Sequence, residues 1–166
     1  MTDNAARAIC LDASVLVKIH FEEPGSDIVR SHCAREPGRY TTPFCFYEAL
    51  NVLKSKWKYQ GQLTAEQYVG ACTGLIAWYG GVYRAGRVRD PEFTSPETFR
   101  AVRELVQRTQ LDFSDALQIF SVKCGYFSRA ADDSRTVLAT ADVPLAAAAR
   151  AEGLRVWNMV TESAPQ

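Results

Sequence analysis

The chain lacks the features that mark several common protein classes. Its five cysteines form no CxxC pair, and its two histidines, His20 and His32, lack the spacing of zinc fingers or ribbons, which disfavours a zinc site. No apolar run approaches the roughly 20 residues that cross a bilayer, and the N-terminal stretch lacks the basic and apolar segments of a secretory signal. We therefore expect a cytoplasmic protein with no membrane partner, whose cysteines are reduced and mostly buried.

An excess of either charge is also absent. The sequence holds 19 Lys and Arg residues and 19 Asp and Glu residues, so its formal net charge is zero. This balance excludes strong overall attraction to nucleic acid but allows a local basic surface. At 166 residues with 47% hydrophobic side chains, and without repeats or linkers, the chain fits one globular domain over residues 1–166.

Short apolar runs alternate with longer segments of helical spacing. Strands alternate with helices at both ends of the chain, which indicates a parallel sheet covered by helices on its two faces. We therefore expect an α/β fold, a three-layer α/β/α sandwich with a central, mostly parallel sheet. The least regular stretch, residues 80–95, has room for a short edge strand near 87–89. Strands are expected at 8–11, 40–42, 135–140 and 154–160, and helices at 14–21, 27–36, 43–59, 65–79, 96–110, 111–124 and 143–152.

Four acidic residues lie within or just after apolar segments: Asp12 after AICL, Glu48 within PFCFYEAL, Asp115 within LDFSDALQIF and Asp142 after TVLATA. A carboxylate beside a packed core costs free energy unless something compensates its charge, and a divalent cation does so effectively. Ligands of open parallel sheets bind beyond the carboxyl ends of the strands, where Asp12 is expected. The four acids therefore suggest a single metal pocket.

Considered singly, each of these acids also has a local structural explanation. Asp12 and Asp142 each precede a predicted helix and can cap its N-terminus, a role for which Ser14 and Thr140 compete. Asp112 and Asp115 stand three apart at a helix start, where both can complement free amides and the helix dipole. Glu48 lies too far into its helix to cap it, which leaves a solvated helix face as the alternative.

Taken together, the motifs LDASVLVK, FYEALN, FSDALQIF and LATADVPLAAAARAEGLRVWN resemble the four acidic motifs of PIN-domain proteins, in the same order. The resemblance spans nearly the whole chain, and residues 80–95 fit it least well. It implies an α/β/α domain with a Mg²⁺- or Mn²⁺-dependent ribonuclease site. The catalytic and metal-binding residues it implies are Asp12, Glu48, Asp115 and Asp142, with Asp112 as an additional acid and with Ser14 and Thr140 orienting carboxylates or waters.

The same resemblance implies partners. Small single-domain proteins of this kind resemble the VapC-type ribonuclease toxins of bacterial type II toxin–antitoxin pairs, which act on RNA and are inhibited by a small antitoxin protein. It also implies a homodimer. The residue types agree with the implied chemistry, since carboxylate ligands without histidine or thiolate suit Mg²⁺ or Mn²⁺, which can activate water for phosphodiester hydrolysis.

A chain of zero net charge must hold RNA with local cations, and two groups stand out. Three lysines follow Glu48 at alternate helical positions, and three arginines lie in the irregular stretch. A solvated surface is the alternative reading for both groups. The candidate RNA-binding residues are Lys54, Lys58, Arg84, Arg87 and Arg89, with Lys56 between the two lysines. Aromatic residues near both ends of the predicted helical hairpin are expected to cover the core, although they suit base stacking or a partner interface as well: Trp57, Tyr59, Trp78 and Tyr79.

Two other functional classes compete with the nuclease. One is a non-catalytic PIN-like module that binds RNA or protein, although such a module has no need of all four acids. The other is a phosphotransfer domain with an aspartyl nucleophile after the first strand. The haloacid-dehalogenase pattern requires a second Asp two residues after the first, and Ser14 occupies that position here. We therefore rank the phosphotransfer domain last.

Overall fold

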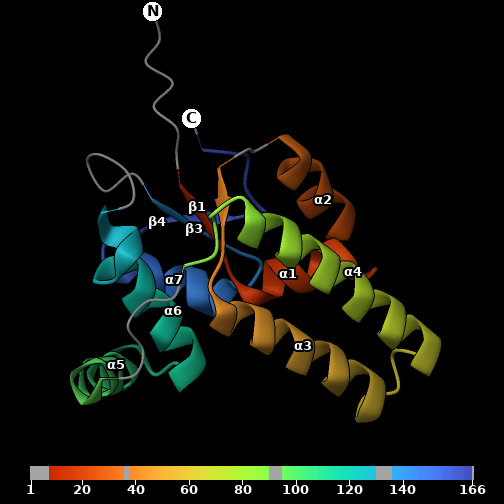
Figure 1. Cartoon of the computed structure of the whole chain (residues 1–166). Coiled ribbons are helices and arrows are strands. Elements are labelled where there is room, and N and C mark those ends of the chain that lie inside the picture. Colours follow the sequence, from red (N-terminus) through yellow and green to blue (C-terminus); the bar gives the residue numbers. More distant parts are fainter. Residues whose placement is uncertain (1–7, 36–37, 90–94, 130–135, 166) are drawn as a thin grey trace, which may run out of the picture.

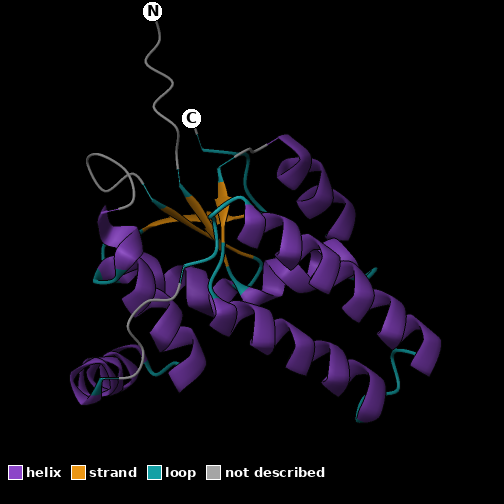
Figure 2. Ribbon diagram, viewed as in Figure 1, coloured by secondary structure: helices purple, strands orange, loops and turns teal. Residues whose placement is uncertain are grey.

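A computed structural model describes residues 8–35, 38–89, 95–129 and 136–165. A four-stranded parallel sheet forms its centre, with the strand order β2-β1-β3-β4 (Figure 2). Ile9 of β1 stands opposite Arg39 of β2 and Val137 of β3, and Val137 stands opposite Arg155 of β4. The strands are β1 (Ile9–Leu11), β2 (Arg39–Tyr40), β3 (Val137–Thr140) and β4 (Arg155–Asn158).

Helices surround this small sheet (Figure 1). Six of them begin with an N-cap side chain that accepts a hydrogen bond from a backbone amide of the first turn, which satisfies a group that the helix itself leaves unpaired. The helices are α1 (Ala13–His20), α2 (Ser26–Arg35), α3 (Pro43–Lys58), α4 (Ala65–Arg84), α5 (Pro96–Thr109), α6 (Phe113–Lys123) and α7 (Val143–Ala151), with a 3₁₀-helix, η1 (Tyr126–Arg129).

Alternate residues of the strands face two separate hydrophobic cores, as the pleat of a strand requires. Ile9 and Leu11 pack into one core with residues of α1, α2, α3 and α4. Cys10 and Leu138 pack into the other with residues of α5, α6, α7 and η1. The sheet is therefore the middle layer of three, which confirms the predicted α/β/α sandwich.

Three local predictions need correction. The helix expected at 65–79 continues to Arg84, so residues 80–84 are helical rather than irregular. The strand expected at 40–42 ends at Tyr40, because Thr42 has become the N-cap of α3 and accepts from the Cys45 amide at 3.0 Å. The edge strand expected near 87–89 is reduced to a single parallel bridge between Thr41 and Val88, and residues 90–94 lie outside the described ranges.

The described cysteines are all free thiols, and three of them, Cys10, Cys33 and Cys45, are buried, as expected from the sequence. The capping box predicted for Thr64 and Gln67 is present, with both hydrogen bonds formed at the start of α4. Among the described helices, none combines the length and the apolar character that crossing a bilayer requires.

Candidate functional site

The candidate acids converge at the carboxyl edge of the sheet. Asp12 directly follows β1, and Asp142 lies two residues beyond the end of β3, the strand that pairs with β1. The Asp12 amide donates to the Ala139 carbonyl at 3.1 Å, which fixes the first loop against the second. Since β2 also pairs with β1 in parallel, α3 starts at this same edge and carries Glu48 toward it.

Asp12 is buried, with 2% of its surface exposed, yet its carboxylate has several donors. It accepts hydrogen bonds from the Val15 amide at 3.0 Å, the Ser14 hydroxyl at 2.8 Å and the Thr140 hydroxyl at 2.6 Å. Burial raises the pKa of Asp12 to about 6, the three donors oppose that rise, and the charge of Glu48 adds to it. Asp12 is thus both a helix cap and a carboxylate held by two hydroxyls that the sequence analysis had singled out.

Glu48 connects the two sides of the site. Its carboxylate accepts hydrogen bonds from the Ser114 hydroxyl and from Gln118 Nε2, the latter at 2.9 Å, and both donors belong to α6. Burial raises its pKa, and the charge of Asp112 raises it further. The alternative of a solvated helix face is therefore wrong for Glu48, because the side chain is held between α3 and α6.

Sequence reasoning missed Ser114 and Gln118. They stand four residues apart on α6, so they share one face of that helix and reach the same carboxylate. The side-chain oxygen of Gln118 is buried and has no hydrogen-bond partner within the described residues. The available signal was a pair of polar residues at helical spacing on either side of Asp115.

The pKa of Asp115 shows most clearly that the acids lie close together. Its pKa rises to about 7, chiefly through burial and then through the negative charges of Asp112, Asp142, Glu48 and Asp12. Its carboxylate accepts no hydrogen bond within the part of the chain that the structure describes. All five acids therefore share one electrostatic environment, and Asp115 is its least compensated member.

Asp112 and Asp142 also act as helix caps, as their positions in the sequence allowed. Asp112 accepts from the Asp115 amide at 2.9 Å and caps α6, while Asp142 accepts from the Leu145 amide at 2.7 Å and caps α7. The Thr140 hydroxyl accepts from the Asp142 amide at 2.9 Å. Capping and clustering are therefore compatible, since helices that start at the same edge bring their caps together.

No cation of the described chain balances this negative charge. Within the described ranges, none of the five acids forms an ion pair with Lys, Arg or His, although other carboxylates such as Glu23 and Glu152 do. Buried thiols lie nearby, but burial raises the pKa of Cys45 to about 12 and that of Cys10 well above its usual value. Both thiols are thus protonated at neutral pH, which leaves oxygen atoms as the ligands that the site offers.

This donor set fits a hard divalent cation such as Mg²⁺ or Mn²⁺. Among the described residues Asp115 has no hydrogen-bond donor, and burial followed by the charges of neighbouring acids raises the pKa values of Asp12, Glu48 and Asp115, as expected of acids that nothing neutralises. In residues 8–35, 38–89, 95–129 and 136–165, no three Asp, Glu, His or Cys side chains are arranged to hold an ion directly. Mg²⁺ commonly takes one or two carboxylates and keeps several waters, so a water-mediated arrangement suits these residues.

The candidate RNA-binding residues differ in exposure and in contacts. Lys56 pairs with Glu23 at 2.7 Å, and Lys54 and Lys58 are exposed on α3. The Arg89 guanidinium lies 4.7 Å from the ring centre of Tyr126, and its Nε has no hydrogen-bond partner within the described residues. Arg87 is half-buried, whereas Arg84 is exposed at the end of α4.

The aromatic residues mostly cover the core, as expected. Trp57 stacks on Tyr68 with ring centres 4.7 Å apart, and Trp78 packs against the same core and meets His20 edge-on. Tyr59 is the exception, with an exposed ring at the end of α3. These contacts leave the two tryptophans with structural roles.

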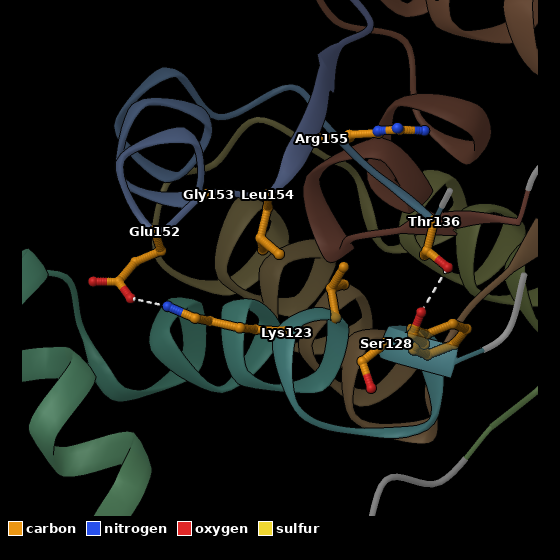
Figure 3. Close-up of a pocket in the computed structure, with 9 residues that line it drawn as sticks. Lys123, Ser128, Thr136, Glu152, Gly153, Leu154 and Arg155 are labelled. Carbon is orange, nitrogen blue, oxygen red and sulfur yellow. Dashed lines mark hydrogen bonds and ion pairs between the residues drawn. The ribbon is translucent and has the colours of Figure 1, made fainter. Parts of the chain in front are cut away.

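A cavity of about 350 Å³ lies at the opposite, amino edge of the sheet, between the end of α6 and the starts of β3 and β4. Figure 3 shows the Lys123 ammonium directed at Glu152, to which it is paired at 2.6 Å. Arg108 also binds Glu152, at 3.3 Å, and these two cations lower its pKa. This cavity therefore contains a carboxylate that its own neighbours neutralise.

Comparisons with known proteins support the fold. No protein-family model matches the chain, and no curated protein matches it. Among solved structures, the crystal structure of PAE2754 from Pyrobaculum aerophilum is similar, with 24% sequence identity and a TM-score of 0.53. The match covers 86% of this chain and 85% of that chain. It extends the likeness to nearly the whole α/β/α arrangement described above.

Proposed function

We propose that this protein is a metal-dependent endoribonuclease that hydrolyses RNA phosphodiester bonds with Mg²⁺ or Mn²⁺. One observation carries the proposal: five carboxylates meet at the carboxyl edge of a parallel sheet, and no cation of the described chain balances them. Such an arrangement is costly for a protein that has no use for it, because like charges near a core destabilise the fold. A divalent cation would remove that cost.

The residues of the proposed site are of two kinds, acids that would bind the cation and polar side chains that orient those acids. Asp12, Glu48, Asp115 and Asp142 are the proposed catalytic and metal-binding acids, and Asp112 adds charge at the same end of α6. Ser14 and Thr140 fix the orientation of the Asp12 carboxylate through their hydroxyl groups. Ser114 and Gln118 do the same for Glu48.

When bound, the cation would lower the pKa of a coordinated water and offset the charge that develops on the phosphodiester. Without metal, the Asp115 carboxyl has a pKa of about 7 and no hydrogen-bond donor within the described residues. A bound cation would lower that pKa, so Asp115 would be ionised near neutral pH and could serve as a ligand.

The finer part of the proposal is that this nuclease is the toxin of a bacterial type II toxin–antitoxin pair, bound by a small antitoxin. Its support is the resemblance of the four acidic motifs to PIN-domain proteins of the VapC type. The runner-up is a PIN-like module that binds RNA or protein without cutting. The exposed cations that this module would use on RNA, Lys54, Lys58 and Arg84, would equally help a nuclease to hold its substrate.

The test is cleavage of total cellular RNA and of a fluorogenic RNA by the purified protein with Mn²⁺ or Mg²⁺. EDTA and the variant Asp12→Asn are the two inactivating conditions. Asn retains an oxygen that can cap α1, so the fold should persist while the charge is lost. We expect cleavage by the wild-type protein alone, and only with the metal present.

Glu152→Gln supplies the matched control, since it removes a carboxylate at the amino edge of the sheet. Cleavage that survives EDTA would contradict the metal-dependent mechanism, and cleavage that survives Asp12→Asn would contradict the assignment of the site. RNA binding without cleavage by the folded wild-type protein would favour the non-catalytic module.

A further inference from the structure

Four aromatic rings form a row across α3 and α4, which lie side by side in Figure 1. The ring centres of Tyr47 and Phe46 are 5.6 Å apart, and both residues belong to α3. Phe46 contacts Tyr79 of α4 with ring centres 4.2 Å apart, and Tyr79 stacks on Tyr83 at 6.4 Å. Tyr47 directly precedes Glu48, so this aromatic row begins beside the candidate site and ends in the last turn of α4.

The two ends of the aromatic row are exposed, whereas its middle is packed. Tyr47 and Tyr83 are 65% and 66% exposed. Phe46 packs against the core, and Tyr79 is half-buried. Packing within the chain therefore explains the two middle rings and not the two outer ones. An exposed ring that its neighbours hold in place can stack a ligand ring with little loss of conformational freedom.

Exposed cations accompany the aromatic row. Four exposed residues of α3 lie within about 60° of one another around the helix axis, on a stripe about 16 Å long: Tyr47, Asn51, Lys54 and Lys58. On α4, the exposed Arg84 directly follows Tyr83. Within the described residues, neither Lys54 nor Arg84 forms an ion pair. Both ends of the aromatic row therefore have a cation available to a ligand.

Acidic residues are scarce on these two helices. Between residues 43 and 84 the sequence holds only Glu48 and Glu66. Glu48 is turned toward α6, and Glu66 lies in the first turn of α4, about 25 Å along that helix from Tyr83. Exposed rings interleaved with cations have the chemistry that binds single-stranded nucleic acid, in which bases stack on the rings and phosphates contact the cations. An apolar protein segment would leave those cations without partners.

We propose that the outer surface of α3 and the end of α4 bind unpaired RNA, with bases stacked on Tyr47 and Tyr83 and phosphates held by Lys54 and Arg84. A duplex does not suit this role, because its bases are stacked on one another and expose no free face. Since Tyr47 adjoins Glu48, a strand on this surface leads toward the acids. The choice of RNA as the ligand rests on the proposed function, whereas the base-binding role of the tyrosines rests on their ring contacts and exposure.

The test is fluorescence anisotropy with two labelled decamers, oligo(A) and a decamer of abasic sites that has the same phosphates and no bases. The full chain with Asp12→Asn is used in EDTA at about 50 mM salt, so that the probes stay intact and charge contacts are weakly screened. We expect oligo(A) to bind at least about 10-fold more tightly than the abasic decamer, because each stacked base adds affinity.

The tyrosine variants separate stacking from charge. Tyr47→Leu and Tyr83→Leu should each weaken the binding of oligo(A) by at least about 5-fold, and change that of the abasic decamer by less than about twofold. Tyr47→Phe and Tyr83→Phe keep the ring, so their affinities should stay within about twofold of the parent protein. Lys54→Gln should weaken the binding of both decamers and reduce the slope of log affinity against log salt by about 1.

Phe99→Leu is the matched control, since Phe99 is 47% exposed and belongs to α5 in the other helical layer. It should leave both affinities unchanged. The base-binding role is overturned by equal affinity for the two decamers, by no binding up to about 500 µM protein, or by a loss in Phe99→Leu as large as in the tyrosine variants. Leucine variants that bind oligo(A) as the parent does would also overturn it and would assign the exposed rings to an apolar protein partner. Circular dichroism verifies that each variant is folded.

Cleavage and binding are measured separately, so the two proposals can fail separately. If the wild-type protein cuts RNA while both leucine variants keep full affinity for oligo(A), the base-binding role is wrong and the proposed nuclease stands. If binding depends on both tyrosines in a protein that never cuts RNA, the base-binding role is supported and the nuclease is contradicted.

Discussion

Carboxylates at the two edges of the sheet differ in their ion pairing and in the direction of their pKa shifts. At the amino edge, Glu152 is paired with Lys123 at 2.6 Å and with Arg108 at 3.3 Å, and its pKa is lowered. At the carboxyl edge, Asp12 and Asp115 have raised pKa values and no cationic partner among the described residues. The acid at the amino edge is thus neutralised by cations of the chain itself. The acids at the carboxyl edge have no such partner among the described residues, so an external cation could balance their charge.

The difference does not arise from burial alone. Asp12 is almost fully buried but has three hydrogen-bond donors, while Asp115 is half-buried and has none within the described chain. The pKa of Asp115 nevertheless rises to about 7, against about 6 for Asp12, because its burial and the charges of four other acids are opposed by no donor within the described chain. Burial without a cationic partner, together with mutual repulsion, therefore separates the carboxyl edge from the amino edge.

The largest effect that should separate the two edges is on RNA cleavage. Asp115→Asn removes one charge and no hydrogen bond to the carboxylate, so it changes the site with little effect on its packing. We expect cleavage to fall by at least about 100-fold, because loss of even an outer partner of a metal ligand costs about 10- to 100-fold. Glu152→Gln should retain wild-type cleavage. Equal losses in both variants, measured with the same fluorogenic RNA, would remove the distinction between the edges.

The pH dependence of stability should also differ between them. The folded-state pKa of Asp12 is about 6 and that of Asp115 about 7, both above the usual 3.8, so in this window the folded chain binds more protons than the unfolded chain. Their contribution to the free energy of unfolding therefore falls as pH rises from about 4 to about 7, by about 3 kcal/mol for Asp12 and by a further amount, reduced by solvent screening, for the half-buried Asp115. The pKa of Glu152 is lowered, so its contribution is lost as pH falls below its usual value of 4.5.

Urea unfolding without metal, from pH 4 to pH 7.5, measures these contributions. The difference in unfolding free energy between wild type and Asp115→Asn should grow in favour of the variant as pH rises. For Glu152→Gln the difference should instead favour the wild type above about pH 5. A pH-independent difference for Asp115→Asn would mean that its carboxyl is not perturbed in the folded chain.

The smallest expected effect is the change in the free energy of unfolding at a fixed pH of 7.5. A substitution at the carboxyl edge and one at the amino edge should change it in opposite directions. Without metal, Asp115→Asn should stabilise the fold by about 1 kcal/mol after allowance for solvent screening, because it relieves repulsion. Glu152→Gln should destabilise it by about 1 kcal/mol, since Lys123 and Arg108 lose their shared partner. A change of the melting temperature in the same direction for both substitutions would contradict the proposed electrostatic difference between the two edges.

Much of this architecture was predictable from local signals. The motif at Asp12, the proline after Thr42 and the capping box at Thr64 each define a helix start, and the structure contains all three. The length of α4 was not predictable, because Gly80 and Gly81 usually end a helix, whereas here the helix continues to Arg84. Tertiary contacts of α4 with α3 and α1 outweigh that local preference.

The acids of the candidate site and the two hydroxyl groups that donate to Asp12 were predictable from the sequence, whereas the donors to Glu48 were not. Residue order and strand ends were enough to bring Asp12 and Asp142 to one edge. The donors to Glu48 come from α6, more than sixty residues away in the sequence, and no local pattern specifies which face of that helix meets α3. Arg89 illustrates the same limit, since its contact with Tyr126 depends on where η1 packs.

Direct measurement of Mn²⁺ binding at pH 7.5, by isothermal titration calorimetry and electron paramagnetic resonance, tests the central claim. We expect saturable binding by the wild-type protein, at least about 10-fold weaker binding by Asp115→Asn, and unchanged binding by Glu152→Gln. Absence of binding by the folded wild-type protein up to about 10 mM Mn²⁺, or binding that Asp115→Asn leaves intact, would contradict a cation site at the carboxyl edge of the sheet.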